Sequence, residues 1–377
     1  MAENSLLRET IGERSISELS QRISNTWPDF KRVAFERQAL GNIAQLGLAE
    51  RIRQVTSALR DSLPEDFSSA TDIIIASLGP ELQQSSVDGL DLSSPNGFIN
   101  LPIGDYIAEY GQQHFNLSML ALEQITKRFT AEGAIRRFIQ GHKAATFEQL
   151  EKWLDHDNVH VRRLVSEGTR PRLPMFSRLP ELIKDPSDVF PLLERLRLDN
   201  ELYVRRSVAN HLNDISKDNP EMVVNLLENW SRDASSHTHW LTKHALRTLI
   251  KQGNPRALKI LGFKPLKGLE ITRFDLDKQE IQLGEAIQLS LEIASPSTTE
   301  SKLLIDYVVY HRKANGKLSP KVFKWSQRSI SQQQPVRIEK QHWIKTISTR
   351  KYYSGQHEIH LQINGEKLAK RTFMLEI

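Results

Sequence analysis

The 377-residue chain contains no cysteine. Without thiols it can form neither disulfides nor thiolate metal sites, and it cannot use a cysteine nucleophile. Long apolar stretches are also missing, because the densest run, Ile73–Ala76, is far too short to cross a bilayer. The first residues lack the basic and then apolar pattern of a signal peptide. We therefore expect a soluble, cytoplasmic protein with no membrane partner.

Several familiar enzyme motifs are absent as well. The sequence contains no GxGxxG, P-loop, HExxH or GxSxG pattern. His156 and His160 are four residues apart, but they flank a predicted turn and have no third ligand at a suitable spacing, so a role at a helix start is favoured over metal binding. We expect no metal and no cofactor, and any chemistry must then depend on carboxylates.

Basic charge is concentrated in the last third of the chain. The net charge is +5, and residues 264–377 hold 19 basic and 12 acidic side chains. Between Arg312 and Lys351 there are eleven basic residues and a single acid, Glu339. Such a field attracts polyanions, most often nucleic acid. The alternative is a solvated surface that only aids solubility.

Helical periodicity extends to about Gly262, with apolar residues at three- and four-residue spacing. A helix–turn–helix pattern at Leu150–Val165 is matched 43 residues later at Leu193–Val208, and a looser third copy runs from Leu227 to Leu246. This period is typical of HEAT-type repeats, whose stacked helix pairs form a solenoid with a concave binding face. We therefore predict a HEAT-like α-helical repeat domain over residues 1–263.

After Phe263 the pattern changes to alternation, which indicates β-strands. Asn315-Gly316 and Asn364-Gly365 are hairpin signals. The predicted strands are Glu270–Leu276, Ala286–Ile293, Leu303–His311, Val322–Arg328, Val336–Ile344, His357–Ile363 and Leu368–Ile377. Seven short strands predict a small immunoglobulin-like sandwich over residues 264–377. The predicted fold class is therefore mainly α, a helical solenoid followed by an all-β domain.

Charged residues form two stripes on neighbouring repeats. Arg163, Glu167 and Arg170 are spaced i, i+4, i+7, and Arg206, Asn210 and Asp214 are spaced i, i+4, i+8. Stacked repeats should bring the two stripes together on one surface. Cations interleaved with carboxylates there would suit a phosphate backbone beside a developing positive charge. From spacing alone, an ordinary i, i+4 ion pair between Arg163 and Glu167 is the favoured alternative.

Four blocks of sequence resemble the AlkC-type DNA alkylation repair glycosylases of the AlkC/AlkD-like HEAT-repeat superfamily. The blocks are Phe129–Arg136, His160–Pro174, Tyr203–Lys217 and Trp240 with Lys243–Lys251. They cover residues 100–263 strongly and occur in the order found in the family. A HEAT-like domain followed by an immunoglobulin-like one is also a layout of that family.

The resemblance implies a monofunctional DNA glycosylase that acts as a monomer on double-stranded DNA containing alkylated bases. Such enzymes cleave the N-glycosidic bond of cationic 3-methyladenine and 3-methylcytosine without extruding the base into a deep pocket. The family's acidic cluster maps onto Glu132, Glu167 and Asp214, which are the implied catalytic residues. The family's Arg-Pro-Arg-Leu-Pro is usually followed by tryptophan, whereas this chain has Met175, so an aromatic face beside the lesion is lost or supplied elsewhere.

The predicted DNA contacts are the cations near these acids and one aromatic residue. They are Arg163, Arg170, Arg172, Arg206, Trp240, Arg247 and Lys251. Arg162 and Arg205 are predicted to make contacts between repeats. Trp325 and Trp343 could touch a sugar, and core packing is expected for at least one of them.

One alternative of a different class stays open. A HEAT-repeat protein that has lost catalysis would bind nucleic acid or act as a scaffold, and Met175 is the feature that suggests it.

Overall fold

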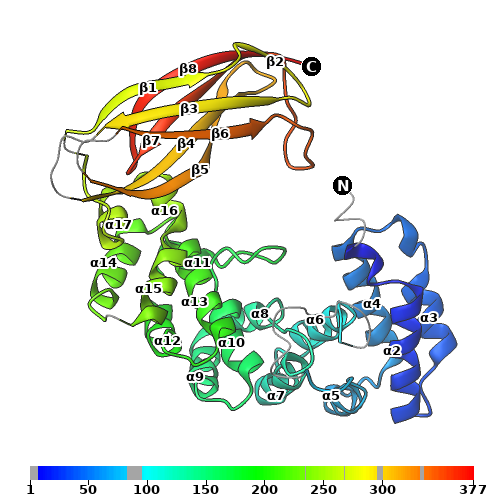
Figure 1. Ribbon diagram of the computed structural model, residues 1–377. Helices are drawn as coiled ribbons and strands as arrows, with labels where there is room; N and C mark the ends of the chain where they lie inside the picture. The colour runs from blue at the N-terminus through cyan, green and yellow to red at the C-terminus, as the bar shows by residue number, and fades with distance from the viewer. Residues whose placement is uncertain (1–6, 83–95, 234, 267, 295–299, 332–334) are drawn as a thin grey trace. The chain divides into compact units, whose positions relative to one another are not determined.

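The computed structural model describes residues 7–82, 96–233, 235–266, 268–294, 300–331 and 335–377. These form two compact units, the first helical and the second mainly β (Figure 1). The helical unit consists of Met1–Val223 and Asp233–Ala245, and the β unit of Val224–Arg232 and Leu246–Ile377. No helix in the described part of the chain is long and apolar enough to span a membrane.

Helices occupy the region where the periodicity predicted them. Those before the β-strands are α2 (Glu13–Thr26), α3 (Arg32–Leu40), α4 (Leu48–Ser62), α5 (Phe67–Ala76), α6 (Asn100–Tyr110), α7 (Phe115–Thr126), α8 (Ile135–Gly141), α9 (Lys143–Trp153), α10 (Val159–Gly168), α11 (Pro180–Lys184), α12 (Phe190–Leu196), α13 (Leu202–Ile215), α14 (Pro220–Trp230), α15 (Ser236–Ala245), α16 (Arg247–Lys251) and α17 (Pro255–Ile260), with short 3₁₀ turns η1 (Ile43–Gln45) and η2 (Ser187–Val189). The prediction of a helical region that ends near residue 262 is confirmed.

The internal repeat corresponds to the helix pairs α9–α10, α12–α13 and α14–α15. The turn residues of the repeat begin each second helix: the Asn158 side chain accepts from His160 N–H at 2.9 Å, and Asp199 accepts from Glu201 N–H at 2.8 Å. These bonds satisfy backbone donors that the first helical turn leaves open. Buried Val161 and Val208 lie where α10 packs against α13, and α13 packs in turn against α15.

The β unit contains two sheets. Its strands are β1 (Glu270–Leu276), β2 (Glu280–Gln282), β3 (Ala286–Ala294), β4 (Ser301–Arg312), β5 (Leu318–Ile330), β6 (Val336–Trp343), β7 (Gly355–Ile363) and β8 (Glu366–Glu376). One sheet has the order β1-β3-β6 and the other β2-β8-β7-β4-β5. Residues of both sheets, such as Leu289, Leu291 and Ile359, Leu361, share one apolar core. All seven predicted strands are present. The sequence missed β2, which has only three residues and pairs in parallel with β8.

Helices α16 and α17 pack against strands within the β unit. Leu258 and Phe263 share a small buried cluster with Leu304 of β4. Gly253 and Gly365 both have positive φ, and a Cβ atom on Gly253 would lie 2.7 Å from the Gly365 carbonyl oxygen. Only glycine permits that approach at low cost. The change from helix to strand lies after Ile260, close to where the sequence places it, and the domain division at residue 263 stays a prediction.

Candidate active site

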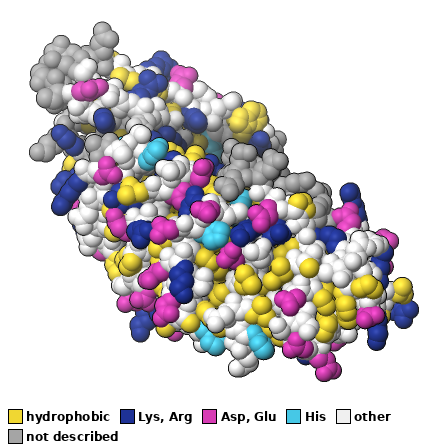
Figure 2. All heavy atoms as spheres, turned by 90° about the horizontal axis from the view of Figure 1, so that it is seen from below, with side chains coloured by type: hydrophobic (Ala, Val, Ile, Leu, Met, Phe, Trp, Pro, Cys, Tyr) yellow, Lys and Arg dark blue, Asp and Glu magenta, His cyan; other side chains and the backbone are white. Residues whose placement is uncertain are grey.

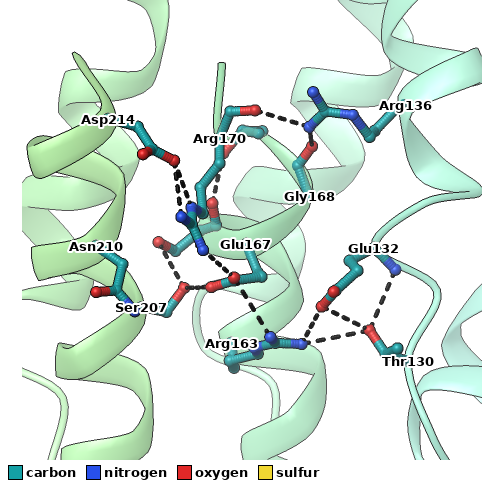
Figure 3. A network of polar contacts seen from close by, with 12 residues as sticks. Thr130, Glu132, Arg136, Arg163, Glu167, Gly168, Arg170, Ser207, Asn210 and Asp214 are labelled. Carbon is teal, nitrogen blue, oxygen red and sulfur yellow. Dashed lines mark hydrogen bonds and ion pairs between the residues drawn. The ribbon is translucent and has the colours of Figure 1, made fainter. Parts of the chain in front are cut away.

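Three carboxylates and two guanidinium groups alternate along one chain of contacts in the helical unit (Figure 3). Arg163 pairs with Glu132, and its Nη2 lies 3.5 Å from Glu167 Oε1. Arg170 pairs with the same Glu167 oxygen, and its Nη2 lies 2.8 Å from Asp214 Oδ2. The acids that the family resemblance implied are thus brought together. We call these five residues the acid–arginine network.

The network forms because α10 packs against α13. Arg163 and Glu167 are one helical turn apart on α10, and Arg170 follows just after that helix ends. Asp214 comes from α13, so the Arg170–Asp214 contact brings the two predicted stripes together, although these residues are buried between the helices and do not lie on one exposed surface as predicted. The i, i+4 pair between Arg163 and Glu167 is present as well. Spacing therefore predicted the Arg163–Glu167 pair within α10, and the packing of α10 on α13 adds Asp214 to the same set of ion pairs.

Burial increases along the network. The exposed fraction of the side chain is 14% for Glu132, 7% for Glu167 and 3% for Asp214. Arg163 and Arg170, together with Lys217 Nζ at 2.7 Å from Asp214 Oδ1, supply three cations for these three anions. Buried carboxylates require such partners, because an unpaired ion in a low dielectric is costly. Glu132 is the acid most accessible to a ligand.

Glu167 is held in its ionised form. Burial alone would raise the pKa of its carboxyl group, but Arg163, Arg170 and a Ser207 hydroxyl bond overcome that effect, so the pKa is lowered. Ser207 Oγ donates to Glu167 Oε2 at 2.5 Å and lies 3.0 Å from Ser166 Oγ. The pKa of Arg163 is raised: burial opposes its charge, and the nearby Glu132 and Glu167 outweigh that opposition.

Arg136 holds the segment that follows α10. Its side chain is fully buried, and its Nη1 donates to the carbonyl oxygens of Gly168 at 2.9 Å and Arg170 at 2.7 Å. Its Nε donates to the Ser177 carbonyl oxygen at 2.7 Å. Burial, followed by the nearby Arg170 charge, lowers the pKa of Arg136 to about 10. These bonds fix the backbone that presents Arg170 to both acids.

Sequence reasoning assigned no role to Arg136, Ser207 or His211. Arg136 lies inside a quoted block and between apolar residues, which was the available signal of burial. Ser207 and His211 lie on α13 facing α10, and burial lowers the pKa of His211 to about 3. A neutral imidazole beside Arg170 adds no further charge to the network. The roles of Ser207 and His211 become visible only from the packing of α10 on α13.

Met175 lies in the segment that Arg136 holds. Its φ is +69°, and 64% of the residue is exposed. The next residue supplies an aromatic ring: Phe176 is half-buried and lies so close to Gly133 that a Cβ atom there would be 2.3 Å from the ring. At the position of the expected tryptophan the chain therefore has the exposed side chain of Met175, and the ring of the next residue, Phe176, packs against Gly133 beside Glu132.

The predicted DNA-contacting residues differ in their surroundings. Arg163 and Arg170 are paired within the acid–arginine network, and Arg172 forms two hydrogen bonds of 2.6 and 2.7 Å with Asp218. Trp240 stacks on His244, whose ring nitrogen lies 3.1 Å from Asn210 Oδ1. Arg206 in the helical unit and Lys251 in the β unit are exposed, and Arg247 in the β unit is half-buried, as Arg163 and Arg172 are.

Of the two arginines assigned to contacts between repeats, one makes such a contact. Arg162 Nε donates to Asp199 of the next repeat at 2.7 Å. Arg205 Nη1 instead donates to the Asp199 and Asn200 carbonyl oxygens, at 2.5 and 2.7 Å, within its own repeat. The prediction for Arg205 is therefore wrong, because the turn before its own helix offers nearer acceptors.

Part of the basic charge of the β unit lies on edge strands, although Lys302 and Arg312 lie on the interior strand β4. β5 is the outer strand of one sheet and β6 of the other, and Lys321 and Arg328 of β5 are exposed. Trp325 is part of the core, whereas Trp343 at the end of β6 is 53% exposed. Charged edges also prevent strands from pairing with other chains. Figure 2, a view of the whole chain from below, shows basic and acidic side chains interspersed over the visible face.

No cluster of His, Asp and Glu side chains within the described ranges is arranged to hold a metal ion. What the network offers is preorganised negative charge beside fixed cations. That arrangement can stabilise a positive charge that develops next to a phosphate backbone.

Comparisons with known proteins agree with this geometry. A family model described as DNA alkylation repair enzyme matches residues 122–249, and one described as the C-terminal Ig-like domain of the uncharacterised protein YhaZ matches residues 270–377. The chain is 35% identical over 361 residues to the uncharacterised protein YhaZ of Bacillus subtilis (strain 168), with 96% of each chain covered. It is also similar to the structure of the Pseudomonas fluorescens alkylpurine DNA glycosylase AlkC bound to DNA containing an abasic site analog. The two sequences are 35% identical, the TM-score is 0.90, and the match covers 98% of this chain and 99% of that chain. The chain therefore belongs to the AlkC-type family of DNA alkylation repair enzymes that carry a C-terminal immunoglobulin-like domain.

Proposed function

We propose that the protein is a monofunctional DNA glycosylase that removes cationic alkylated bases, 3-methyladenine and 3-methylcytosine, from double-stranded DNA. The observation that carries the proposal is the acid–arginine network, in which three carboxylates meet on facing repeats. The similarity of nearly the whole chain to an alkylpurine DNA glycosylase supports the same proposal.

The chemistry needs no general acid. A base methylated on a ring nitrogen is already cationic, so the C–N bond breaks with its electron pair moving to the base, which leaves neutral. The sugar becomes an oxocarbenium ion, as in glycoside hydrolysis. Water then forms the new bond to C1′ and releases a proton to solvent. Negative charge near the sugar lowers the barrier, because positive charge moves from the base toward it.

The three acids have different tasks in this proposal. Glu167 and Asp214 supply fixed negative charge toward the deoxyribose from buried positions, while Arg163 and Arg170 pair with them and hold them in place. Glu132 is the most exposed acid, and its bonds to Thr130 and Arg163 both use Oε2. Its Oε1 is our candidate for orienting the attacking water.

DNA binding completes the proposal. The helical repeats act as a HEAT-like solenoid that cradles the duplex, with the base not extruded into a deep pocket. Arg172, Arg206, Trp240, Arg247 and Lys251 contact the backbone, and the basic residues 312–351 add contacts that do not depend on sequence. Arg163 and Arg170 are already paired with the acids, so a DNA phosphate contact by either one requires its guanidinium group to bond to the phosphate and to an acid at the same time. Action as a cytoplasmic monomer stays a prediction.

The test is the release of methylated bases from alkylated DNA under single-turnover conditions. Glu167→Gln and Asp214→Asn should each lower the excision rate by about 10²–10³-fold, because one stabilising group of this kind contributes that much. DNA affinity should stay equal or become tighter, since negative charge is removed. Asp199→Asn is the matched control, because Asp199 is also paired with an arginine in these repeats but lies outside the network. Unchanged excision in both network variants would refute the assignment.

A non-catalytic DNA-binding protein is the second candidate. It is favoured by the full pairing of Glu167 and Asp214 and by Met175 at the position where the family usually has tryptophan. Well-folded protein that binds DNA in a salt-dependent way and releases no methylated base would establish this candidate instead.

A further inference from the structure

We infer that the helical unit holds a binding pocket for a single free nucleobase, the neutral base that the proposed reaction releases. The pocket is a cavity of about 310 Å³ beside the segment that carries Glu132. This inference rests on the proposed function, because that reaction supplies the ligand.

The cavity is formed by segments far apart in the sequence. Ala49, Ile52 and Arg53 come from α4, and Leu101 and Asp105 from α6. The residues on either side of Glu132 and the Met175–Ser177 segment close the other walls. Thr130, which lines the cavity, also donates its hydroxyl to Glu132 at 2.9 Å. The cavity and the acid–arginine network therefore share one wall.

The size of the cavity fits one base. Small-molecule sites in proteins usually measure about 300–1000 Å³, so 310 Å³ lies at the lower limit, a size that suits one base. Ile52, Leu101, Met175 and Phe176 supply apolar and aromatic surface. Proteins bind bases between such surfaces and read the polar edge with hydrogen bonds.

Asp105 is the polar group that can read the edge of a base. Its side chain is one-quarter exposed, and its Oδ1 lies 3.7 Å from Arg137 Nη2, beyond a good hydrogen bond. The carboxylate can therefore accept a bond from the exocyclic amino group of an adenine. Burial raises the pKa of Asp105 above its ordinary value, which brings the protonated form, a donor toward a ring nitrogen, closer to neutral pH. Arg53 and Arg137 line the cavity as well, so recognition of a base depends on the hydrogen bonds of Asp105 and not on exclusion of anions.

Equilibrium dialysis or calorimetry of the full chain with free 3-methyladenine tests the pocket. We expect saturable binding of one molecule per chain. Asp105→Asn should weaken it at least tenfold, because a neutral amide oxygen accepts a hydrogen bond more weakly than a carboxylate oxygen. Ala49→Trp, at an exposed position of the rim, should also abolish binding by filling the mouth, and it disturbs no buried contact. Glu109→Gln is the matched control: Glu109 also pairs with Arg137 but does not line the cavity, so binding should be unchanged.

The outcomes separate the pocket from the proposed reaction. Protein that excises methylated bases but binds no free base would overturn the pocket and leave the glycosylase proposal standing. Saturable binding that Asp105→Asn and Ala49→Trp abolish, in protein without excision activity, would support a nucleobase site and refute the reaction. Equal weakening by Asp105→Asn and Glu109→Gln, or full binding by Ala49→Trp, would place the ligand elsewhere and overturn the inference.

Discussion

The two units of the molecule differ in their main buried polar groups, although the helical unit also buries His211 and the β unit also buries Asp306. The helical unit buries ions: Glu167 and Asp214 lie beneath the surface together with Arg163 and Arg170. The β unit buries neutral rings instead, and His311, His342 and His357 are each almost fully inaccessible within the sandwich. Its cations lie mainly on the surface, as Lys321 and Arg328 on the outer strand β5 do.

The physical consequences differ accordingly. Burial lowers the pKa of His311 to about 3 and that of His342 to about 4, so both rings are neutral near pH 7. His342 Nδ1 lies 3.0 Å from the Tyr307 hydroxyl, and His311 Nε2 lies 2.5 Å from Arg350 Nη1. A neutral ring costs less to bury than an ion does. Buried ions survive only as complete pairs, and they are expected where the function needs fixed charge.

Removing a cation from the buried network should have the largest effect on stability. Arg170→Met leaves Glu167 and Asp214 without their shared partner, so we expect a loss of about 3–5 kcal/mol in the free energy of unfolding. Arg172→Met is the control, because the Arg172–Asp218 pair lies near the surface and should contribute about 0–1 kcal/mol. Urea unfolding of the two variants measures both values, and equal losses would show that the network is not a buried ion system.

A smaller change tests how Glu167 is kept ionised. Ser207→Ala removes the hydroxyl donor to Glu167 Oε2 and should cost about 1.5–3 kcal/mol, the usual value for a bond to a charged group. Because the pKa of Glu167 is lowered in the folded protein, its contribution to stability is present above about pH 4.5 and is lost as pH falls through the folded value.

The Ser207→Ala variant should therefore lose excision activity at a higher pH than wild type on the acid side of the profile. A purely structural role would lower activity equally at every pH. Comparison of single-turnover rates from pH 4 to pH 8 decides between the two.

Acid should weaken the β unit through its histidines. His311, His342 and His357 have lowered pKa values when folded, so the unfolded chain takes up protons first as pH falls below about 6.5. Each such proton reduces the free energy of unfolding by about 1.4 kcal/mol per pH unit. Calorimetry of His311→Gln, which keeps an acceptor for Arg350 but cannot be protonated, should show a slope smaller by one proton. An unchanged slope would mean that His311 does not remain neutral in the folded state.

The smallest effect concerns the surface of the β unit. Replacing Lys321 and Arg328 by Gln should weaken DNA binding less than tenfold per residue and reduce the slope of log K against log salt by about 0.9 per lost phosphate contact. Arg273→Gln is the control, because Arg273 is paired with Asp275 on β1. If the slope does not change, these cations only protect the sheet edge from pairing.

Sequence reasoning identified local structure and missed contacts at long range. The strand Glu270–Leu276 was predicted with its observed bounds, because alternation within one segment is a local signal. Strand β2 was missed because it has three residues and exists only by pairing with β8. Arg205 was predicted to contact a neighbouring repeat, but it bonds to the Asp199 and Asn200 carbonyl oxygens of its own repeat, because the acceptors within its reach depend on how the turn folds.

The sequence by itself determined that this chain is helical and then β and that its helices repeat, and it named three acids as candidates for catalysis. Periodicity and family motifs are properties of short segments, so no folded coordinates were needed. Only the tertiary structure decided that Arg163 and Arg170 pair with those acids and that Arg136 bonds to the backbone carbonyl oxygen of Arg170. It also decided that α4 and α6 help to line a cavity beside the Glu132 segment. Those relations depend on how helices distant in sequence pack, and packing places ionic side chains within hydrogen-bonding distance only once the whole unit has folded.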